Sequence, residues 1–279
     1  MKALVKEKPT IGLTLMDVDI PSYQDNEILI KVKRTAICGT DLHIWNWDAW
    51  AQKTIKTPMT IGHEFMGEVA EVGKNVKDFK VGQRVSVESH IAGTKSRNAR
   101  AGKLHLDPDT INLGVDRDGA FAEYVVVPEK NVVPLPDSVE DNLASILDPF
   151  GNAVHSTLSF DLVGEDVLIT GAGPIGIMSA AIAEHVGAKK VLLTDINQKR
   201  LELAAKVCDV ETLNVSTMPI KQKMTAMGLK EGFDVGLEMS GSEQALRDMV
   251  DCMIMGGDIA LLGLPSEEIK VDLSQIIFK

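Results

Sequence analysis

The stretch "DVLITGAGPIG", residues 166–176, constrains the fold of this chain more than any other. An apolar run leads into a G-x-G-x-x-G pattern formed by Gly171, Gly173 and Gly176, and residues typical of a helix follow. In such a strand–turn–helix unit the first glycine permits the tight turn, the second admits a pyrophosphate, and the third lets helix and strand pack closely. Because the pyrophosphate lies at the helix N-terminus, the pattern predicts a dinucleotide site, although glycines that merely form a turn are the alternative.

The next apolar run, "KVLLTD", supports the dinucleotide interpretation. It ends in Asp195, about 20 residues beyond the glycines. A carboxylate at this point accepts hydrogen bonds from the ribose 2′-hydroxyl and repels a 2′-phosphate, so NAD is favoured over NADP. Arg200 lies nearby and offers a partner for a phosphate, but an arginine in the first turn of a solvated helix needs no such role.

The hydrophobic period changes near residue 148 and divides the chain into two predicted domains. Residues 1–147 contain short β-type runs such as "EILIKVKRTAI", "FMGEVAEVG" and "AFAEYVVVP", which predict a mainly-β domain. In residues 148–279, apolar strand-type runs alternate with helical segments, which predicts a parallel sheet wound by helices. The stretch "DPFGNAVHSTLSF" predicts a helix with Asp148 as its acidic cap and a proline at its first position.

Charge and composition restrict the partners that we expect. The net charge of −11 argues against nucleic acid, so a small-molecule substrate is favoured. The chain shows neither a signal peptide nor an apolar run of membrane-spanning length, which predicts a cytoplasmic protein without a membrane partner. Cys38, Cys208 and Cys252 are too scattered for a disulfide framework, and each is interpreted as a reduced thiol or, for one of them, a metal ligand.

Two short stretches of the first half contain groups that bind zinc. "AICGTDLH" provides Cys38, Thr40 and His43, and "IGHEFMGEV" provides His63 and Glu64. Catalytic zinc takes three protein ligands from cysteine, histidine and carboxylate and keeps one position open. Cys38, His63 and an acid satisfy this requirement, although each stretch alone is weak evidence, because buried cysteines and histidines are usually structural.

Five stretches together resemble one enzyme family. "CGTDLH", "GHEFMGEV", "GAFAEYVVVP", "DPFGNAVHS" and "GAGPIG" are similar to the zinc-dependent medium-chain dehydrogenases, and above all to those that oxidise L-threonine. The resemblance runs through nearly the whole chain. It implies an α/β protein with a GroES-like catalytic domain followed by a Rossmann domain, and the oxidation of the 3-hydroxyl of L-threonine to 2-amino-3-oxobutanoate in threonine catabolism.

The resemblance also implies individual roles. Catalytic zinc is expected on Cys38, His63 and Glu64, with Asp148 near the metal as a proton-relay acid or outer ligand. Thr40 and His43 match the relay that carries the proton of the substrate hydroxyl to solvent. The positions implied to bind NAD are Gly171, Gly173, Ile175, Gly176, Asp195, Arg200, Leu262, Gly263 and Leu264.

The chain departs from the family in two places. Relatives hold a structural zinc on four cysteines, and Gly93, Ser96, Ala99 and Asp107 occupy those positions here. A zinc site without its ligands cannot form, so we expect one zinc per chain and a mobile or rebuilt loop. The chain also ends at "QIIFK", where relatives continue, which makes the second domain look truncated and predicts a homo-oligomer, as a dimer that covers the exposed sheet edge.

Three functions remain open from the sequence. The first is an active L-threonine dehydrogenase. The second is an enzyme for another secondary alcohol, such as a polyol or 2,3-butanediol, and the third is a dinucleotide- or metal-binding scaffold without turnover. His90 and the tryptophans Trp45, Trp47 and Trp50 are candidates for holding the substrate by their proximity to the motifs, although packing is the preferred interpretation of the tryptophans.

Overall fold

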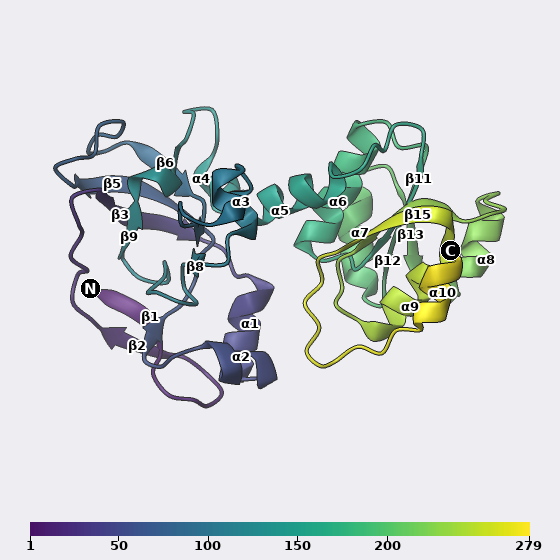
Figure 1. Ribbon diagram of the computed structural model, residues 1–279, viewed down its shortest axis with the longest axis horizontal. Helices are drawn as coiled ribbons and strands as arrows, with labels where there is room; N and C mark the ends of the chain where they lie inside the picture. Colours follow the sequence, from purple (N-terminus) through teal and green to yellow (C-terminus); the bar gives the residue numbers. More distant parts are fainter. The chain divides into compact units, whose positions relative to one another are not determined.

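The computed structural model describes residues 1–279 and divides into two compact units, Met1–Asp148 and Pro149–Lys279. In Figure 1 the first unit runs from purple to teal and the second from teal to yellow. No helix in either unit combines the length and apolar character needed to cross a membrane.

The first unit is built around an antiparallel sheet of five strands in the order β10-β6-β5-β3-β9. These strands are β3 (Glu27–Thr35), β5 (Phe65–Val72), β6 (Arg84–Val87), β9 (Tyr124–Pro128) and β10 (Val132–Pro134). A second sheet has the order β2-β1-β4, from β1 (Lys2–Lys6), β2 (Thr14–Asp17) and β4 (Met59–Thr60). Branched apolar side chains of the larger sheet, among them Ile28, Ile30 and Val127, form its core, as expected for residues that pack well on a pleated surface.

Two short helices in this unit were not predicted, α1 (Gly39–Asn46) and α2 (Ala49–Thr54). The sequences of α1 and α2 have no sustained apolar period, and few side chains of either helix are buried. Ile44 of α1 and Ala51 of α2 are fully buried against Ile61. The interpretation of the first domain as mainly β is right for its sheets, but it missed helices that tertiary packing stabilises.

The second unit is a parallel sheet of five strands in the order β13-β12-β11-β14-β15, with helices on both faces. Its strands are β11 (Asp166–Thr170), β12 (Lys190–Asp195), β13 (Glu211–Asn214), β14 (Phe233–Glu238) and β15 (Met253–Leu261). Its helices are α5 (Leu147–Thr157, which begins in the first unit), α6 (Pro174–His185), α7 (Gln198–Val207), α8 (Ile220–Ala226), α9 (Glu243–Cys252) and α10 (Leu273–Phe278). The first strand in the sequence lies at the centre, so the winding direction reverses between β11 and β14, where open α/β sheets bind ligands.

The two faces of this sheet explain the continuous apolar runs of its strands. Val167 and Ile169 point to the face covered by α6 and α7, and Leu168 between them points to the face covered by α8 and α9. Both faces are therefore buried, and every residue of β11 is buried. The predicted α/β class, a GroES-like unit followed by a Rossmann unit, is confirmed. Strand β13 and helix α8 were not predicted, because their apolar patterns are short and polar residues separate them.

Helix α5 begins two residues earlier than predicted. Leu147 is its first residue, so Asp148 lies inside the first turn and Pro149 follows as the third residue instead of the first. The preceding short helix α4 (Asp141–Ala144) leads almost directly into α5, which leaves no extended cap residue at Asp148. The predicted cap position was wrong, but an acidic side chain within the first turn still interacts favourably with the helix dipole.

The lobe between residues 90 and 112 contains β7 (His90–Ile91), α3 (Arg97–Arg100), the 3-10 turn η1 (Leu104–Leu106) and β8 (Ile111–Asn112). Its organising side chain is Asp107, which is buried and accepts a hydrogen bond from the Gly93 N–H. A hydrogen bond from Ser96 holds the pKa of Asp107 below its usual value, and Ser96 Oγ also caps α3 by accepting from Ala99 N at 3.0 Å. The loop that we expected to be mobile or rebuilt thus has defined structure, because the Asp107 carboxylate links Gly93 and Ser96.

Candidate active site

His63 and Glu64 lie in a turn between β4 and β5. Glycines in and near this turn allow neighbouring segments to pack closely against it. Gly62 has a φ of +90°, and a Cβ atom on it would lie 2.2 Å from the ring of Phe121. A Cβ atom on Gly119 would lie 2.1 Å from the Gly62 carbonyl oxygen. The Glu64 carbonyl accepts from Ala36 N at 3.0 Å, which places the turn next to the segment that leads to Cys38.

Cys38 occupies the N-cap position of α1, in extended conformation. Its backbone N–H donates to Asp41 Oδ2 at 2.9 Å, and its thiol contacts Thr40 Oγ1 at 3.6 Å. Asp41 is buried, and its other oxygen, Oδ1, has no hydrogen-bond partner in the structure. Asp41 was not among the predicted site residues, although an acid three residues after a helix N-cap is a recognisable capping signal.

The three predicted metal ligands come together. The ligand atoms of Cys38, His63 and Glu64 all lie within 4.8 Å of one another, with Glu64 buried and the other two half-buried. With zinc–ligand bonds of about 2.0–2.3 Å, the ligand atoms around a tetrahedral ion are roughly 3.3–3.8 Å apart. The 4.8 Å limit on the observed separations approaches that spacing, and thiolate, imidazole and carboxylate are donors that zinc accepts, so the residues fit the metal.

Burial favours the neutral forms of Cys38 and Glu64 in the metal-free protein. Burial, and then the charge of Asp148, raises the pKa of Glu64 to about 7. Burial raises the pKa of the Cys38 thiol to about 11, with a smaller contribution from the charge of Glu64. A metal ligand must be deprotonated, so binding of a divalent cation would release protons from this cluster.

Asp148 lies beside the cluster, as its effect on the pKa of Glu64 indicates. Ser89 Oγ donates to Asp148 Oδ1 at 2.8 Å, and burial raises the pKa of the Asp148 carboxyl. The ligand atoms of Asp148, Glu88 and His90 form a second group within 4.8 Å of one another. His90 is exposed and its Nδ1 lies 2.7 Å from Glu88 Oε1, so this candidate for substrate contact already has an acidic partner.

His43 has a partner that the sequence analysis missed. Its Nδ1 makes a short hydrogen bond with Asp48 Oδ2, and the Trp50 ring lies edge-on with its centroid 6.0 Å away. The other oxygen of Asp48 accepts from Ala51 N at 3.0 Å and so caps α2. An aspartate before a short helix was visible in the sequence, but its contact with His43 depends on the turn between α1 and α2.

Two of the three tryptophans are half-buried and packed against the core, and one is exposed. Trp47 and Trp50 pack against the buried cluster that includes Ile44, whereas Trp45 is 46% exposed. The Lys6 side chain is fully buried beneath them, donates to the carbonyl oxygens of Gly12 and Trp45, and lies 5.0 Å from the centroid of Trp47. Trp47 and Trp50 therefore have a structural role, and Lys6 links β1 to α1 through the Trp45 carbonyl oxygen.

The glycine turn of the second unit follows β11 directly. Gly171 has a φ of +94°, and a Cβ atom on it would lie 2.9 Å from Ser240 N. A Cβ atom on Gly176 would lie 1.9 Å from the Gly171 carbonyl oxygen, so only glycine permits this approach of helix to turn. Nothing lies within 4 Å of a Cβ on Gly173, the N-cap of α6, so this side of the turn is open. An open helix N-terminus without a side-chain cap fits a pyrophosphate group.

Asp195 ends β12 beside this turn. Its Oδ2 accepts from Ala172 N at 2.8 Å and its Oδ1 accepts from Asn197 N at 2.8 Å, so the carboxylate is oriented by backbone groups from two segments. Arg200 Nη1 lies 3.7 Å from Asp195 Oδ2 and its side chain is 56% exposed. The end of β12 beside the glycine turn is therefore acidic, with an arginine at its edge.

The remaining predicted cofactor residues lie at the same edge of the sheet. Leu262 and Gly263 donate their N–H groups to the Glu238 carbonyl oxygen at 2.9 and 3.0 Å, while Leu264 is 47% exposed. Ile175 is half-buried in the first turn of α6. The structure thus brings all nine predicted cofactor positions to the second unit and the metal ligands, with Thr40, His43 and Asp148, to the first.

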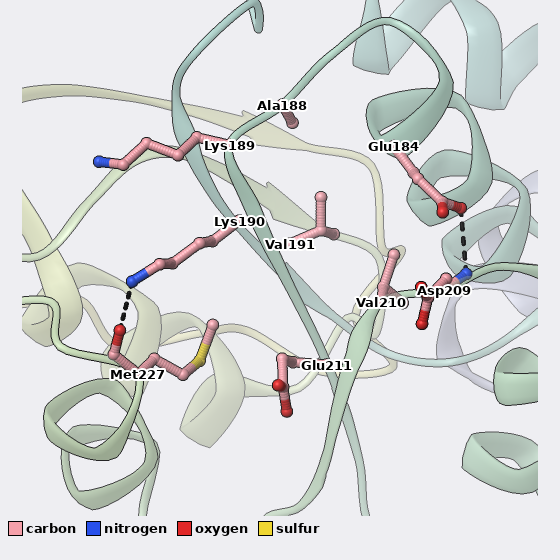
Figure 2. A pocket seen from close by; sticks show the side chains of 9 residues that line it. All are labelled: Glu184, Ala188, Lys189, Lys190, Val191, Asp209, Val210, Glu211 and Met227. Atoms are coloured by element: carbon pink, nitrogen blue, oxygen red, sulfur yellow. Dashed lines mark hydrogen bonds between the residues drawn. The ribbon is translucent and has the colours of Figure 1, made fainter.

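A hollow of about 250 Å³ lies at the opposite edge of the second unit, where Lys190 begins β12 and Glu211 begins β13. Figure 2 shows two of its polar side chains with hydrogen-bond partners: Lys190 donates to the Met227 carbonyl, and Glu184 accepts from the Asp209 N–H. None of the predicted site residues lines it. Parallel sheets bind ligands at the carboxyl ends of their strands, so this hollow is separate from the dinucleotide site.

Comparison with known proteins matches both units to families. Residues 24–137 match the alcohol dehydrogenase GroES-like domain, and residues 174–279 match the zinc-binding dehydrogenase family. The chain is 57% identical over 279 residues to an L-threonine 3-dehydrogenase from Chromobacterium violaceum, in an alignment that covers all of this chain and 82% of the relative.

Solved structures show the same architecture. A zinc-binding dehydrogenase from Sinorhizobium meliloti bound to NADP superposes with a TM-score of 0.91 at 27% identity, over 99% of this chain and 81% of that one. An Escherichia coli alcohol dehydrogenase complexed with NADH superposes with a TM-score of 0.90 at 30% identity, over 99% and 80% of the two chains. The shared architecture therefore accommodates either dinucleotide.

Proposed function

The chain belongs to the zinc-dependent alcohol dehydrogenase family, and from this we propose that it is an oxidoreductase that converts L-threonine to 2-amino-3-oxobutanoate with NAD. The cluster of Cys38, His63 and Glu64 is the observation that carries the proposal. It offers the three donor types of a catalytic zinc in a half-buried setting, and the full-length similarity to an L-threonine 3-dehydrogenase supports the choice of substrate.

Cys38, His63 and Glu64 would hold the metal, and the second unit would hold NAD. A bound zinc ion supplies Lewis acidity that lowers the pKa of a substrate hydroxyl, and NAD accepts the hydride. Gly171, Gly173 and Gly176, with the cofactor residues named above, would bind the dinucleotide. Because both oxygens of Asp195 are fixed by backbone amides, its charge stays where a 2′-phosphate would be repelled, which favours NAD over NADP.

Thr40 and His43 would carry the proton of the substrate hydroxyl toward solvent. Thr40 Oγ1 is already in contact with the Cys38 thiol, which places a hydroxyl at the cluster. His43 is half-buried and held at Nδ1 by Asp48, which leaves its Nε2 to exchange a proton. Asp148 would act near the metal as a second acid, because Ser89 fixes its carboxyl and burial keeps its pKa raised.

We propose one zinc ion per chain. Gly93, Ser96, Ala99 and Asp107 offer no thiol, and the only carboxylate among them already accepts hydrogen bonds from the lobe itself. Zinc content of the purified chain measured by mass spectrometry tests this number, and two ions per chain would contradict it.

The test of function is the rate of NADH formation from NAD and L-threonine by the zinc-loaded chain. Cys38→Ser removes one ligand, and we expect it to lose zinc and to lower the rate by at least about 1,000-fold, while NADH binding to the second unit persists. A panel with 2,3-butanediol and polyols in place of L-threonine tests the substrate. A chain that binds zinc and NADH but oxidises none of these would favour a scaffold without turnover.

A further inference from the structure

A buried carboxylate lies at the carboxyl edge of the parallel sheet, outside every motif of the proposed function. Glu238 is the last residue of β14, is only 3% exposed, and pairs in register with Thr170 of β11 on one side and Leu261 of β15 on the other. It therefore lies at the end of the central strands, between the glycine turn and the segment after β15.

Neutral donors from two segments surround this carboxylate. Its Oε1 accepts from the Thr170 hydroxyl at 3.2 Å, from Ser240 N at 2.9 Å and from the Ser240 hydroxyl, and its Oε2 accepts from Gly241 N at 3.1 Å. The donor groups are two hydroxyls and two backbone amides. A carboxylate matches this set because it only accepts hydrogen bonds and has two oxygens with about four acceptor sites.

Three glycines let the backbone around Glu238 pack closely. A Cβ atom on Gly171 would lie 2.9 Å from Ser240 N, and one on Gly241 would lie 2.5 Å from the Leu264 carbonyl oxygen. A Cβ atom on Gly263 would lie 2.0 Å from Gly241 N and 2.6 Å from Glu238 Oε2. The glycine turn, the loop after β14 and the segment after β15 thus meet at one point, where Glu238 contacts them through its carboxylate and its carbonyl oxygen.

We propose that Glu238 is a positioning residue of the dinucleotide site. Its carboxylate holds the loop after β14 against the glycine turn, and its carbonyl oxygen holds Leu262 and Gly263, so three segments that border the cofactor keep one arrangement before the cofactor binds. The inference rests on the proposed function, because it assumes that this edge binds NAD. Preorganisation of this kind contributes affinity by lowering the ordering cost of binding.

The proposal can be tested with Glu238→Gln, which keeps the side-chain shape but replaces one oxygen with an N–H donor. That donor must face either the Ser240 or the Gly241 amide, so at least one hydrogen bond to the carboxylate is lost and two donors oppose each other. We expect NADH affinity, measured by fluorescence titration, to fall about 10- to 100-fold. The KM for NAD should rise in parallel, while kcat at saturating NAD and the zinc content stay within about twofold of the parent values.

Asp166→Asn is the matched control. Asp166 is a buried carboxylate at the amino end of β11, at the opposite edge of the same sheet. This variant should lower the melting temperature comparably and leave NADH affinity unchanged, which separates loss of positioning from loss of stability. Equal losses of NADH affinity in both variants, or none in Glu238→Gln, would overturn the role of Glu238.

Two further results keep the test decisive. If Glu238→Gln does not fold, Thr170→Val removes one donor to the carboxylate at constant shape, and NADH affinity equal to that of the parent would contradict the proposal. If the parent chain itself binds zinc but no dinucleotide, the proposed function fails and the inference about Glu238 fails with it. If the parent binds NADH and only the role of Glu238 is wrong, the variants alone reveal this.

Discussion

The metal cluster of the first unit and the glycine turn of the second are built in opposite ways. Cys38, His63 and Glu64 bring reactive side chains from two segments into a half-buried place, where burial holds two of their pKa values high. The glycine turn works by the absence of side chains, since Gly171 and Gly176 let backbone contact backbone. One site depends on protonation and the other on steric fit, so they should respond to different perturbations.

The largest effect that we expect comes from a single methyl group in the glycine turn. In Gly176→Ala the new Cβ would lie 1.9 Å from the Gly171 carbonyl oxygen, so helix α6 or the turn must move. We expect NADH affinity to fall roughly 100-fold, or about 3 kcal/mol, from overpacking at this contact. The zinc content should not change, because the metal cluster lies in the other unit.

Gly173→Ala makes the same chemical change where the structure has room. Nothing lies within 4 Å of its Cβ, so the melting temperature of the metal-loaded, cofactor-free protein should equal that of the parent. A lower NADH affinity with unchanged stability would show that the methyl group meets the cofactor. If Gly176→Ala binds NADH as the parent does, the steric description of this site is wrong.

The metal cluster should instead respond to pH. The pKa of Glu64 is raised from 4.5 to about 7, so the folded metal-free protein retains a proton that the unfolded chain loses. The contribution of Glu64 to stability is then fully present below about pH 4.5 and is lost as the pH rises to about 7. We expect the free energy of unfolding of the first unit to fall by at most about 3 kcal/mol across this window.

Thermal or urea unfolding of the chelator-treated protein at several pH values measures this effect. Glu64→Gln cannot ionise, so its stability should vary less with pH than that of the parent. Zinc should shift the dependence in the other direction, because the ligands must lose protons to bind it. A pH dependence that is the same in Glu64→Gln and in the parent would place the titrating group elsewhere.

The two sites also differ in how much of them the sequence predicts. The glycine turn is local: strand, turn and helix are contiguous, and Asp195 ends the next strand, so spacing alone predicted the unit. The metal cluster joins residues 25 positions apart, and the complete set of ligands was assigned only from a family resemblance. Elementary patterns predicted cysteine, histidine and an acid, but they did not select Glu64 as the acid.

Contacts that depend on tertiary packing could not be predicted from the sequence. Asp48 reaches His43 only because two short helices meet at a turn, and neither helix has an apolar period that predicts it. Asp107 was counted as a lost cysteine position, although a carboxylate there accepts the hydrogen bonds that organise the lobe. Glu238 stands in an apolar strand and gives no local signal of the four donors that surround it.

A moderate effect is expected from Asp48→Asn, which alters the metal site without touching a ligand. The asparagine can still cap α2 but no longer holds the His43 ring as a carboxylate does. We expect kcat to fall about 10-fold while the KM for L-threonine and the zinc content remain the same. Ala51 N–H protection in hydrogen exchange checks that α2 is intact, and an unchanged kcat would remove His43 and Asp48 from the proton path.

The smallest effect should come from the lobe, which combines the two modes of construction. Asp107 is a reactive type of side chain, yet it works here as a fixed acceptor for Gly93 N–H and Ser96, much as backbone contacts fix the glycine turn. Asp107→Asn should lower the melting temperature by only a few degrees and leave the rate and the zinc content unchanged. Asp109→Asn, an exposed acid two residues away, is the control and should change neither. Removal of zinc could instead lower the stability of the lobe as much as Asp107→Asn does. The lobe would then depend on a metal, and the contrast between a metal-dependent catalytic cluster and a metal-independent lobe would fail.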